Sequence, residues 1–186
     1  MSLHHPRGCS LKLFDPSGTG SVRSLAVRLH QSVPEIFSLR YVLDADLRRL
    51  RVPATRTPER RDELWRHTCF ELFVRKGGDG TGYYELNVSP STEWALYAFE
   101  GYHENRVAVD PVQPPQARVT RDDNMLQLEV ELDLRGLPHS DEVAPAAVIE
   151  EEGDGLSYWA LKHLSARPDF HHPDSFSSVD SWRRED

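Results

Sequence analysis

The stretch CFELFVRKGGDGTGYYELNVSP, residues 69–90, consists of two short alternating runs on either side of a glycine-rich segment. In the first run Phe70 and Leu72 share one face, and in the second run Tyr84 and Leu86 share one face. Apolar residues at every second position are typical of a half-buried β-strand. Two such runs joined by a glycine-rich segment predict an antiparallel hairpin.

The same alternation extends from about residue 21 to residue 165 in about ten runs, of which MLQLEVELDL (125–134) is the most regular. Turns rich in Gly, Pro and Asp separate the runs, and helix signals are limited to one or two turns within 58–67. A last strand is expected near 174–180. The pattern predicts an all-β fold: an antiparallel β-sandwich, jelly-roll or immunoglobulin-like, of about ten strands and forming one domain over residues 1–186.

The charge and the apolar content of the chain argue against nucleic acid and membranes as partners. The chain has 186 residues, a net charge of −8 and a pI near 5.6, which argues against nucleic-acid binding. Six arginines crowd between Arg48 and Arg61, and we interpret them as a solvated or salt-bridged stretch. No run approaches the ~18 apolar residues of a membrane span. The N-terminal segment lacks a signal-peptide pattern, so a cytoplasmic protein without a membrane partner is expected.

The second face of the run at 83–89 is unusual because it carries Tyr83, Glu85 and Asn87. It is too aromatic for a plain solvent face and too polar for a core. The hairpin makes Glu71 a neighbour of Glu85, and Trp65, Trp94 and Tyr102 lie close by in the sequence. Aromatic rings beside hydrogen-bonding carboxylates and amides suit a sugar, whose C–H patches stack on rings.

That face has a second interpretation. The aromatic residues could close a small second core under loops, with Glu85 and Asn87 satisfying backbone groups at a strand end. For Trp65, Tyr83 and Trp94 the two interpretations, core and ligand contact, both remain open.

Three ordered segments, WRHTCFELFV (65–74), YYELNVSPSTEWALYAFEGY (83–102) and YWALKH…PDFHHPDSF (158–176), resemble bacterial DOMON-like proteins. That group is similar to family 9 carbohydrate-binding modules, and the resemblance covers about residues 60–180. It implies a β-sandwich that binds a ligand, such as a sugar or haem, without transforming it. In sugar-binding relatives tryptophans clamp the ring, and the resemblance puts forward Trp65, Trp94 and Trp159 for that part.

Histidine and acidic residues between His163 and His172 form a second notable segment. His163, Asp169 and His171 are weak candidates for metal ligands, because His and carboxylate groups suit zinc. The spacing matches no known metal motif, so a proline-bounded turn is the simpler interpretation. Haem bound through a histidine stays an alternative, as does calcium at the acidic turns 77–80 and 150–155, but no cofactor is expected.

The leading hypothesis is therefore a non-catalytic β-sandwich that binds a carbohydrate or another small molecule. The alternative from another class is a glycoside-active enzyme that uses Glu71 and Glu85 as a carboxylate pair. A module that binds a protein partner is a third option, and it would need a large exposed apolar patch.

Overall fold

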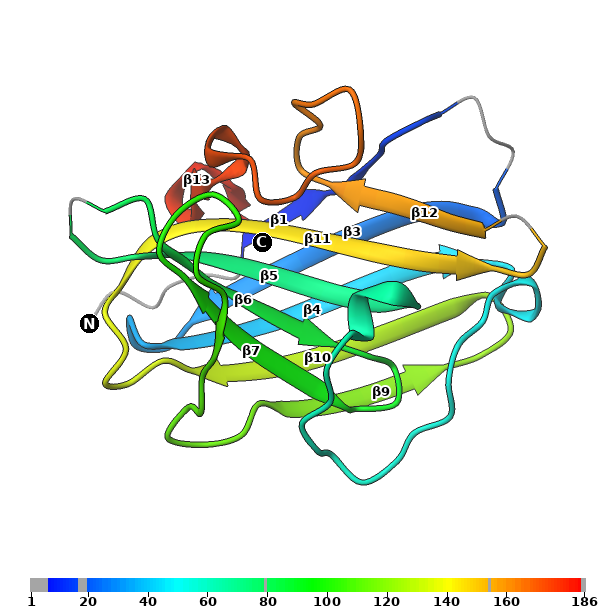
Figure 1. Ribbon diagram of the computed structural model, residues 1–186. Helices are drawn as coiled ribbons and strands as arrows, with labels where there is room; N and C mark the ends of the chain where they lie inside the picture. Colours follow the sequence, from blue (N-terminus) through cyan, green and yellow to red (C-terminus); the bar gives the residue numbers. More distant parts are fainter. Residues whose placement is uncertain (1–6, 17–19, 79, 154, 185–186) are drawn as a thin grey trace.

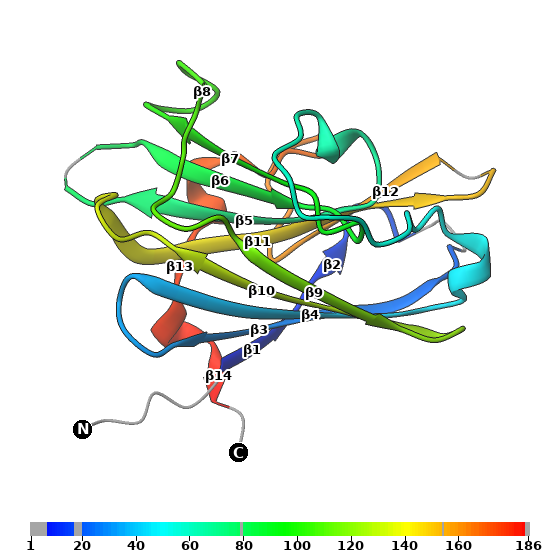
Figure 2. The ribbon, with the colours of Figure 1, turned by 90° about the horizontal axis from the view of Figure 1, so that it is seen from below.

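The structure, a computed structural model, describes residues 7–16, 20–78, 80–153 and 155–184. Its strands form two antiparallel sheets that pack face to face (Figure 1). Figure 2 shows the two layers from a direction in which they separate clearly. The prediction of an all-β sandwich is confirmed.

One sheet has the strand order β14-β1-β3-β4-β10-β9. We call it the six-stranded sheet. Its strands are β1 (Arg7–Ser10), β3 (Val22–Gln31), β4 (Ile36–Ala45), β9 (Gln116–Arg121), β10 (Met125–Asp133) and β14 (Arg183–Arg184).

The other sheet has the order β2-β12-β11-β5-β6-β7-β8, and β13 pairs with β11. We call it the eight-stranded sheet. Its strands are β2 (Lys12–Leu13), β5 (Cys69–Lys76), β6 (Tyr83–Val88), β7 (Trp94–Phe99), β8 (Val107–Ala108), β11 (His139–Glu151), β12 (Gly155–Ala160) and β13 (Ser177–Ser178). The predicted hairpin is β5–β6, in register from Phe70–Val88 to Arg75–Tyr83.

The main core lies between the sheets and follows the alternation. From the six-stranded sheet it takes the inward residues of β3, β4 and β10, such as Leu29, Leu39 and Leu128. From the eight-stranded sheet it takes Leu72 and Leu86. These five side chains are at most 3% exposed, so each contributes most of its hydrophobic transfer free energy to folding.

Strand β11 contains a proline, Pro145, which is unusual inside a sheet. Pro145 pairs with Leu72 of β5. On the other side of β11, β13 pairs as far as Val143 and β12 pairs from Ala146. Pro145 thus lies in the gap between two partners, where a missing N–H costs little.

Helical structure in the described residues is limited to four short 3₁₀ helices: η1 (Leu47–Arg49), η2 (Leu64–Arg66), η3 (Pro173–Ser175) and η4 (Val179–Ser181). None of the described helices is long and apolar enough to cross a membrane. Of the crowded arginines, Arg48, Arg51, Arg56, Arg60 and Arg61 each lie within ion-pair distance of a carboxylate.

Candidate functional site

The outer face of the eight-stranded sheet is covered by a second apolar cluster instead of solvent. Phe73 of β5, Tyr83 of β6 and Phe99 of β7 pack there against Phe170 and Phe176 of the C-terminal segment. As a result every residue of β6 and β7 is buried, on both faces. These strands were expected to be half-buried, and they differ because segment 161–176 adds a further layer over the sheet.

A pocket of about 1020 Å³ opens beside this cluster. That volume is at the upper end of the range for small-molecule sites, about 300–1,000 Å³. Its rim carries Trp65, Tyr102 and Leu156, three large apolar side chains that remain at least one-third exposed. The other lining residues are Arg66, Glu71, Glu85, Phe99, His103, Arg106, Val148, Tyr158, Ser165, Ala166, Arg167, Pro168, Asp169, Phe170 and His171.

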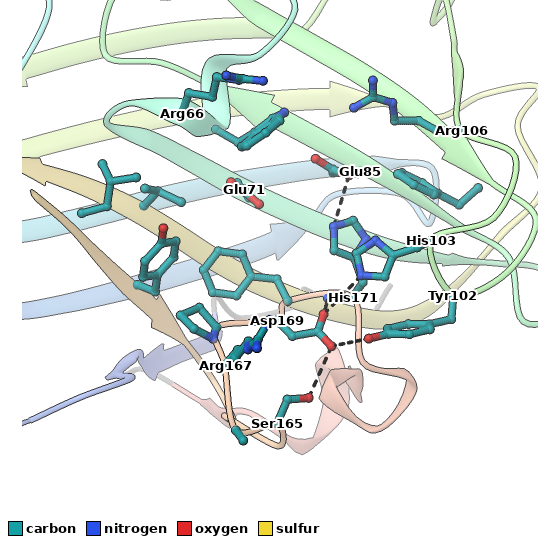
Figure 3. Close-up of a pocket in the computed structure, with 18 residues that line it drawn as sticks. Arg66, Glu71, Glu85, Tyr102, His103, Arg106, Ser165, Arg167, Asp169 and His171 are labelled. Carbon is teal, nitrogen blue, oxygen red and sulfur yellow. Dashed lines mark hydrogen bonds and ion pairs between the residues drawn. The ribbon is translucent and has the colours of Figure 1, made fainter.

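Two buried glutamates, Glu71 and Glu85, are part of the pocket wall (Figure 3). They lie on the neighbouring strands β5 and β6, where Glu71 pairs with Asn87 and Glu85 with Phe73, so the two are diagonal neighbours. The Oε1 atom of Glu71 is buried without a hydrogen-bond partner. Burial raises the pKa of Glu71 well above its ordinary value, and the charge of Glu85 raises it further.

Glu85 is better satisfied than Glu71. The side-chain amide of Asn87 donates a hydrogen bond of 2.6 Å to Glu85 Oε1. Burial raises the pKa of Glu85, while the Asn87 hydrogen bond and the charge of Arg106 oppose that rise. Asn87 also accepts from the thiol of Cys69 at 3.5 Å. Asn87 is fully buried and is not among the lining residues, so it supports Glu85 from behind.

His171 connects the acidic pair to the C-terminal segment. Its Nδ1 lies 2.7 Å from the hydroxyl of Tyr83, and its Nε2 lies 3.9 Å from Glu85 Oε2. Burial lowers the pKa of His171 to about 4, with the nearby His103 as the next cause. His171 is therefore neutral at neutral pH, and its contact with Glu85 is not an ion pair. Its ring lies against that of His103, with centroids 4.0 Å apart.

Asp169 fixes the rim next to these histidines. It accepts hydrogen bonds from the Tyr102 hydroxyl at 2.7 Å and from the backbone N–H of His171 at 2.9 Å. Burial opposes ionisation of Asp169, but these two hydrogen bonds and the nearby His103 outweigh it and lower its pKa. Asp169 is thus a charged anchor that joins the 161–172 segment to the loop after β7.

The structure separates the sequence-predicted residues into three groups. Trp65, Glu71, Glu85 and Tyr102 come together at the pocket. Tyr83 and Asn87 lie behind it as supports: the Tyr83 ring stacks on Phe99 with centroids 4.7 Å apart. Trp94 and Trp159 lie away from the pocket, because both pack in the core between the sheets.

The reason for the difference is the pleat of the sheet. Trp94 pairs with the core residue Val88, and Trp159 pairs with the core residue Ala147, so both rings point inward, away from Glu85. Of the three tryptophans put forward by the resemblance, only Trp65 therefore lines this pocket. The pocket has Trp65, Tyr158 and Phe170 among its walls.

The candidate metal ligands do not assemble. His163 Nε2 lies 2.7 Å from the backbone oxygen of Lys12, and the His163 ring contacts Phe14. Asp169 and His171 belong to the pocket. Among the described residues no group of three or more His, Cys, Asp or Glu side chains is placed to hold a metal ion. Of the acidic turns, Asp79 and Asp154 lie outside the described residues.

Sequence reasoning missed His103, Arg106, Arg167 and Phe170. His103 and Arg106 follow Tyr102 in a tight loop, where His103 adopts the left-handed conformation with φ 56°. Loop residues carry no periodic signal, so nothing local shows that they face β6. Arg167 and Phe170 belong to a segment that was singled out for its histidine and acidic residues.

The chain is similar in fold to a Bacteroides uniformis ATCC 8492 protein of known crystal structure that has been proposed to bind carbohydrate. The TM-score is 0.65 and the identity 13%, over 93% of this chain and 84% of that chain. A family 9 carbohydrate-binding module from Caldicellulosiruptor kristjanssonii, solved with glucose, gives a TM-score of 0.47 and 10% identity over 90% of this chain and 82% of that chain. No protein-family model and no curated protein matches the chain. The first similarity supports the β-sandwich fold.

Proposed function

We propose that this β-sandwich binds a carbohydrate or a chemically similar small molecule, without transforming it, in the pocket over β5 and β6. The observation that carries the proposal is the pair Glu71 and Glu85, buried at a pocket edged by exposed aromatic rings. A buried carboxyl oxygen without a partner is costly, and a ligand hydroxyl group would satisfy such an acid.

The aromatic walls of the pocket suit the apolar face of a sugar ring. A pyranose has apolar C–H faces, which pack on aromatic rings such as those of Trp65 and Tyr158. The exposed position of Trp65, 37% accessible, costs free energy that a bound ring would recover. The B. uniformis protein of similar fold is itself proposed to bind carbohydrate.

The same two glutamates are the basis of the alternative function, hydrolysis of a glycoside. A catalytic pair needs one carboxylic acid and one carboxylate, so their environments must push the two pKa values apart. Burial raises the pKa of both Glu71 and Glu85, while the Asn87 hydrogen bond and the charge of Arg106 oppose the rise at Glu85 alone. Turnover of a glycoside is therefore the measurement that separates the two functions.

The test is calorimetry and thermal shift with a panel of mono- and oligosaccharides on the full chain. A ligand held at ~100 times its Kd adds about 2.7 kcal/mol to stability, which raises the Tm visibly. We expect Trp65→Ala and Glu85→Gln each to weaken binding of the same sugar about tenfold, which corresponds to about 1.4 kcal/mol.

Glu131→Gln is the matched control, because Glu131 is an exposed acid on β10 of the other sheet. It should leave binding unchanged. Unaltered affinity in both Trp65→Ala and Glu85→Gln would reject this pocket as the site. Release of reducing ends from a glycoside, lost in Glu71→Gln with the Tm maintained, would instead establish the enzyme.

A further inference from the structure

Arginine pairing is uneven over the molecule. Most described arginines lie within ion-pair distance of a carboxylate, as expected in a chain of net charge −8. Arg106 and Arg167 are exceptions: no carboxylate of the described residues lies within ion-pair distance of either, and both line the pocket. Arg106 instead lies over the ring of Tyr97, 4.9 Å from its centroid.

A third cation, Arg66, stands on η2 beside Trp65 and pairs with Glu63 at 3.0 Å. Figure 3 shows Arg66 and Arg106 on one side of the acidic pair and Arg167 on the other. The three guanidinium groups come from three separate segments of the chain. They are the three guanidinium groups among the lining residues, and His171 adds no charge at neutral pH.

The acidic side chains of the pocket do not fully cancel this charge. Asp169 supplies one negative charge and is contacted by Tyr102, by the backbone N–H of His171 and by His103. Glu71 and Glu85 are buried neighbours, and two like charges so close cannot both ionise without cost. The pair therefore carries less than two full negative charges, so the acidic lining residues together carry less than three, against three guanidinium groups.

We propose that the pocket selects an acidic saccharide, whose carboxylate, sulfate or phosphate group binds at Arg106 and Arg167 while its ring lies against the aromatic wall. This inference rests on the proposed function, which it extends from carbohydrates in general to those that carry a negative charge. Guanidinium groups suit such oxyanions because they donate two parallel hydrogen bonds in a plane. Glu71 and Glu85 then face the neutral hydroxyl groups of the same ring.

The test compares matched sugars by calorimetry: glucose, glucuronic acid, glucose 6-phosphate and glucosamine, together with galactose and galacturonic acid. At least one acidic sugar should bind about tenfold tighter than its neutral parent, a difference of about 1.4 kcal/mol. That preference should shrink at a salt concentration of about 0.5 M, because salt screens exposed charges. Tighter binding of glucuronic or galacturonic acid would identify the recognised group as a carboxylate. Tighter binding of glucose 6-phosphate would identify it as a phosphate.

Arg106→Gln and Arg167→Gln should each reduce the preference several-fold. Arg118→Gln is the matched control, because Arg118 lies on β9 of the six-stranded sheet and also has no carboxylate within ion-pair distance among the described residues. These exposed side chains contribute little to folding, so an unchanged Tm verifies each variant.

Equal binding of neutral and acidic sugars, or tighter binding of glucosamine, would overturn the acidic-saccharide inference and leave carbohydrate binding intact. Inorganic phosphate that binds as tightly as glucose 6-phosphate would overturn it as well, since the sugar would then contribute nothing. Failure of every saccharide to bind would reject the proposed function itself.

Discussion

Glu71 is a buried acid in an unfavourable environment. It is 3% exposed, its Oε1 has no partner, and Glu85 stands beside it. Natural cores seldom retain such a group unless it has a use. In the free protein a bound proton removes the charge of Glu71 and so lowers the free-energy cost of its burial. The stability of the protein therefore depends on pH through this residue.

The sign of that dependence follows from the raised pKa. An unfolded glutamate titrates near ~4.3, and burial moves the pKa of folded Glu71 well above this. Between the two values the folded state binds more protons, so stability is full below ~4.3 and falls as pH rises through the folded pKa. Each pH unit in that window removes up to about 1.4 kcal/mol.

We expect Glu71→Gln to flatten this part of the curve, because glutamine does not ionise. The measurement is urea unfolding of both proteins at unit steps from about pH 4 to about pH 8, a range that begins near the pKa of an unfolded glutamate and extends well above it. His171, whose pKa is lowered to about 4, makes stability rise with pH over an overlapping range. It is present in both proteins, so the difference between them reports the titration of the Glu71–Glu85 pair without the contribution of His171. Parallel curves would contradict the assignment.

The same alternation of apolar and polar residues gives β6 a buried outward face and β10 an accessible one. In β6, Tyr84 and Leu86 point into the main core, and Tyr83 and Glu85 point to the opposite side. The polar side is buried because segment 161–176, helix η2 and the loop after β7 lie across it. In β10, which has no such cover, the outward residues Glu129 and Glu131 remain accessible, and Glu129 pairs with Arg40.

The contribution of an inward strand position can be measured with Leu128 of β10, which is fully buried in the main core. Leu128→Ala leaves a cavity and should cost about 2–5 kcal/mol of unfolding free energy. Leu164 is the matched control of the same residue type, at 45% exposed. Leu164→Ala should change stability by less than about 0.5 kcal/mol. Similar losses in both variants would contradict the inward placement of Leu128.

The molecule as a whole carries one free thiol in each sheet, Cys9 on β1 and Cys69 on β5. Burial raises the pKa of Cys9 to about 12 and the pKa of Cys69 well above its ordinary value. The thiolate is the reactive form, so both should resist thiol reagents in the folded protein. Shared packing of the two sheets predicts that they unfold together.

We therefore expect both cysteines to become reactive at the same denaturant concentration, coincident with loss of tryptophan fluorescence signal. The measurement is pulsed thiol labelling across a urea series, followed by peptide mass spectrometry. Cys9→Ser and Cys69→Ala report each thiol separately. Labelling of one cysteine well before the other would show that the sheets open independently.

Alternation along the chain was sufficient to predict the β-sandwich, the β5–β6 hairpin and the two faces of β6, because strand geometry repeats every two residues. The same rule would have placed Trp94 inward, since it shares its face with Leu96. Trp159 had no such local guide: its neighbours on that face are Ser157 and Leu161.

Local alternation is enough to set the fold class and to place Glu71 and Glu85 on one outward face. The packing of distant segments covers that face, brings Trp65 but not Trp94 or Trp159 to the pocket, and adds Arg106 and Arg167 to its lining. The physical reason is distance along the chain. Tyr83 and His171 meet across 88 residues, and contacts of that span depend on how whole sheets and loops pack.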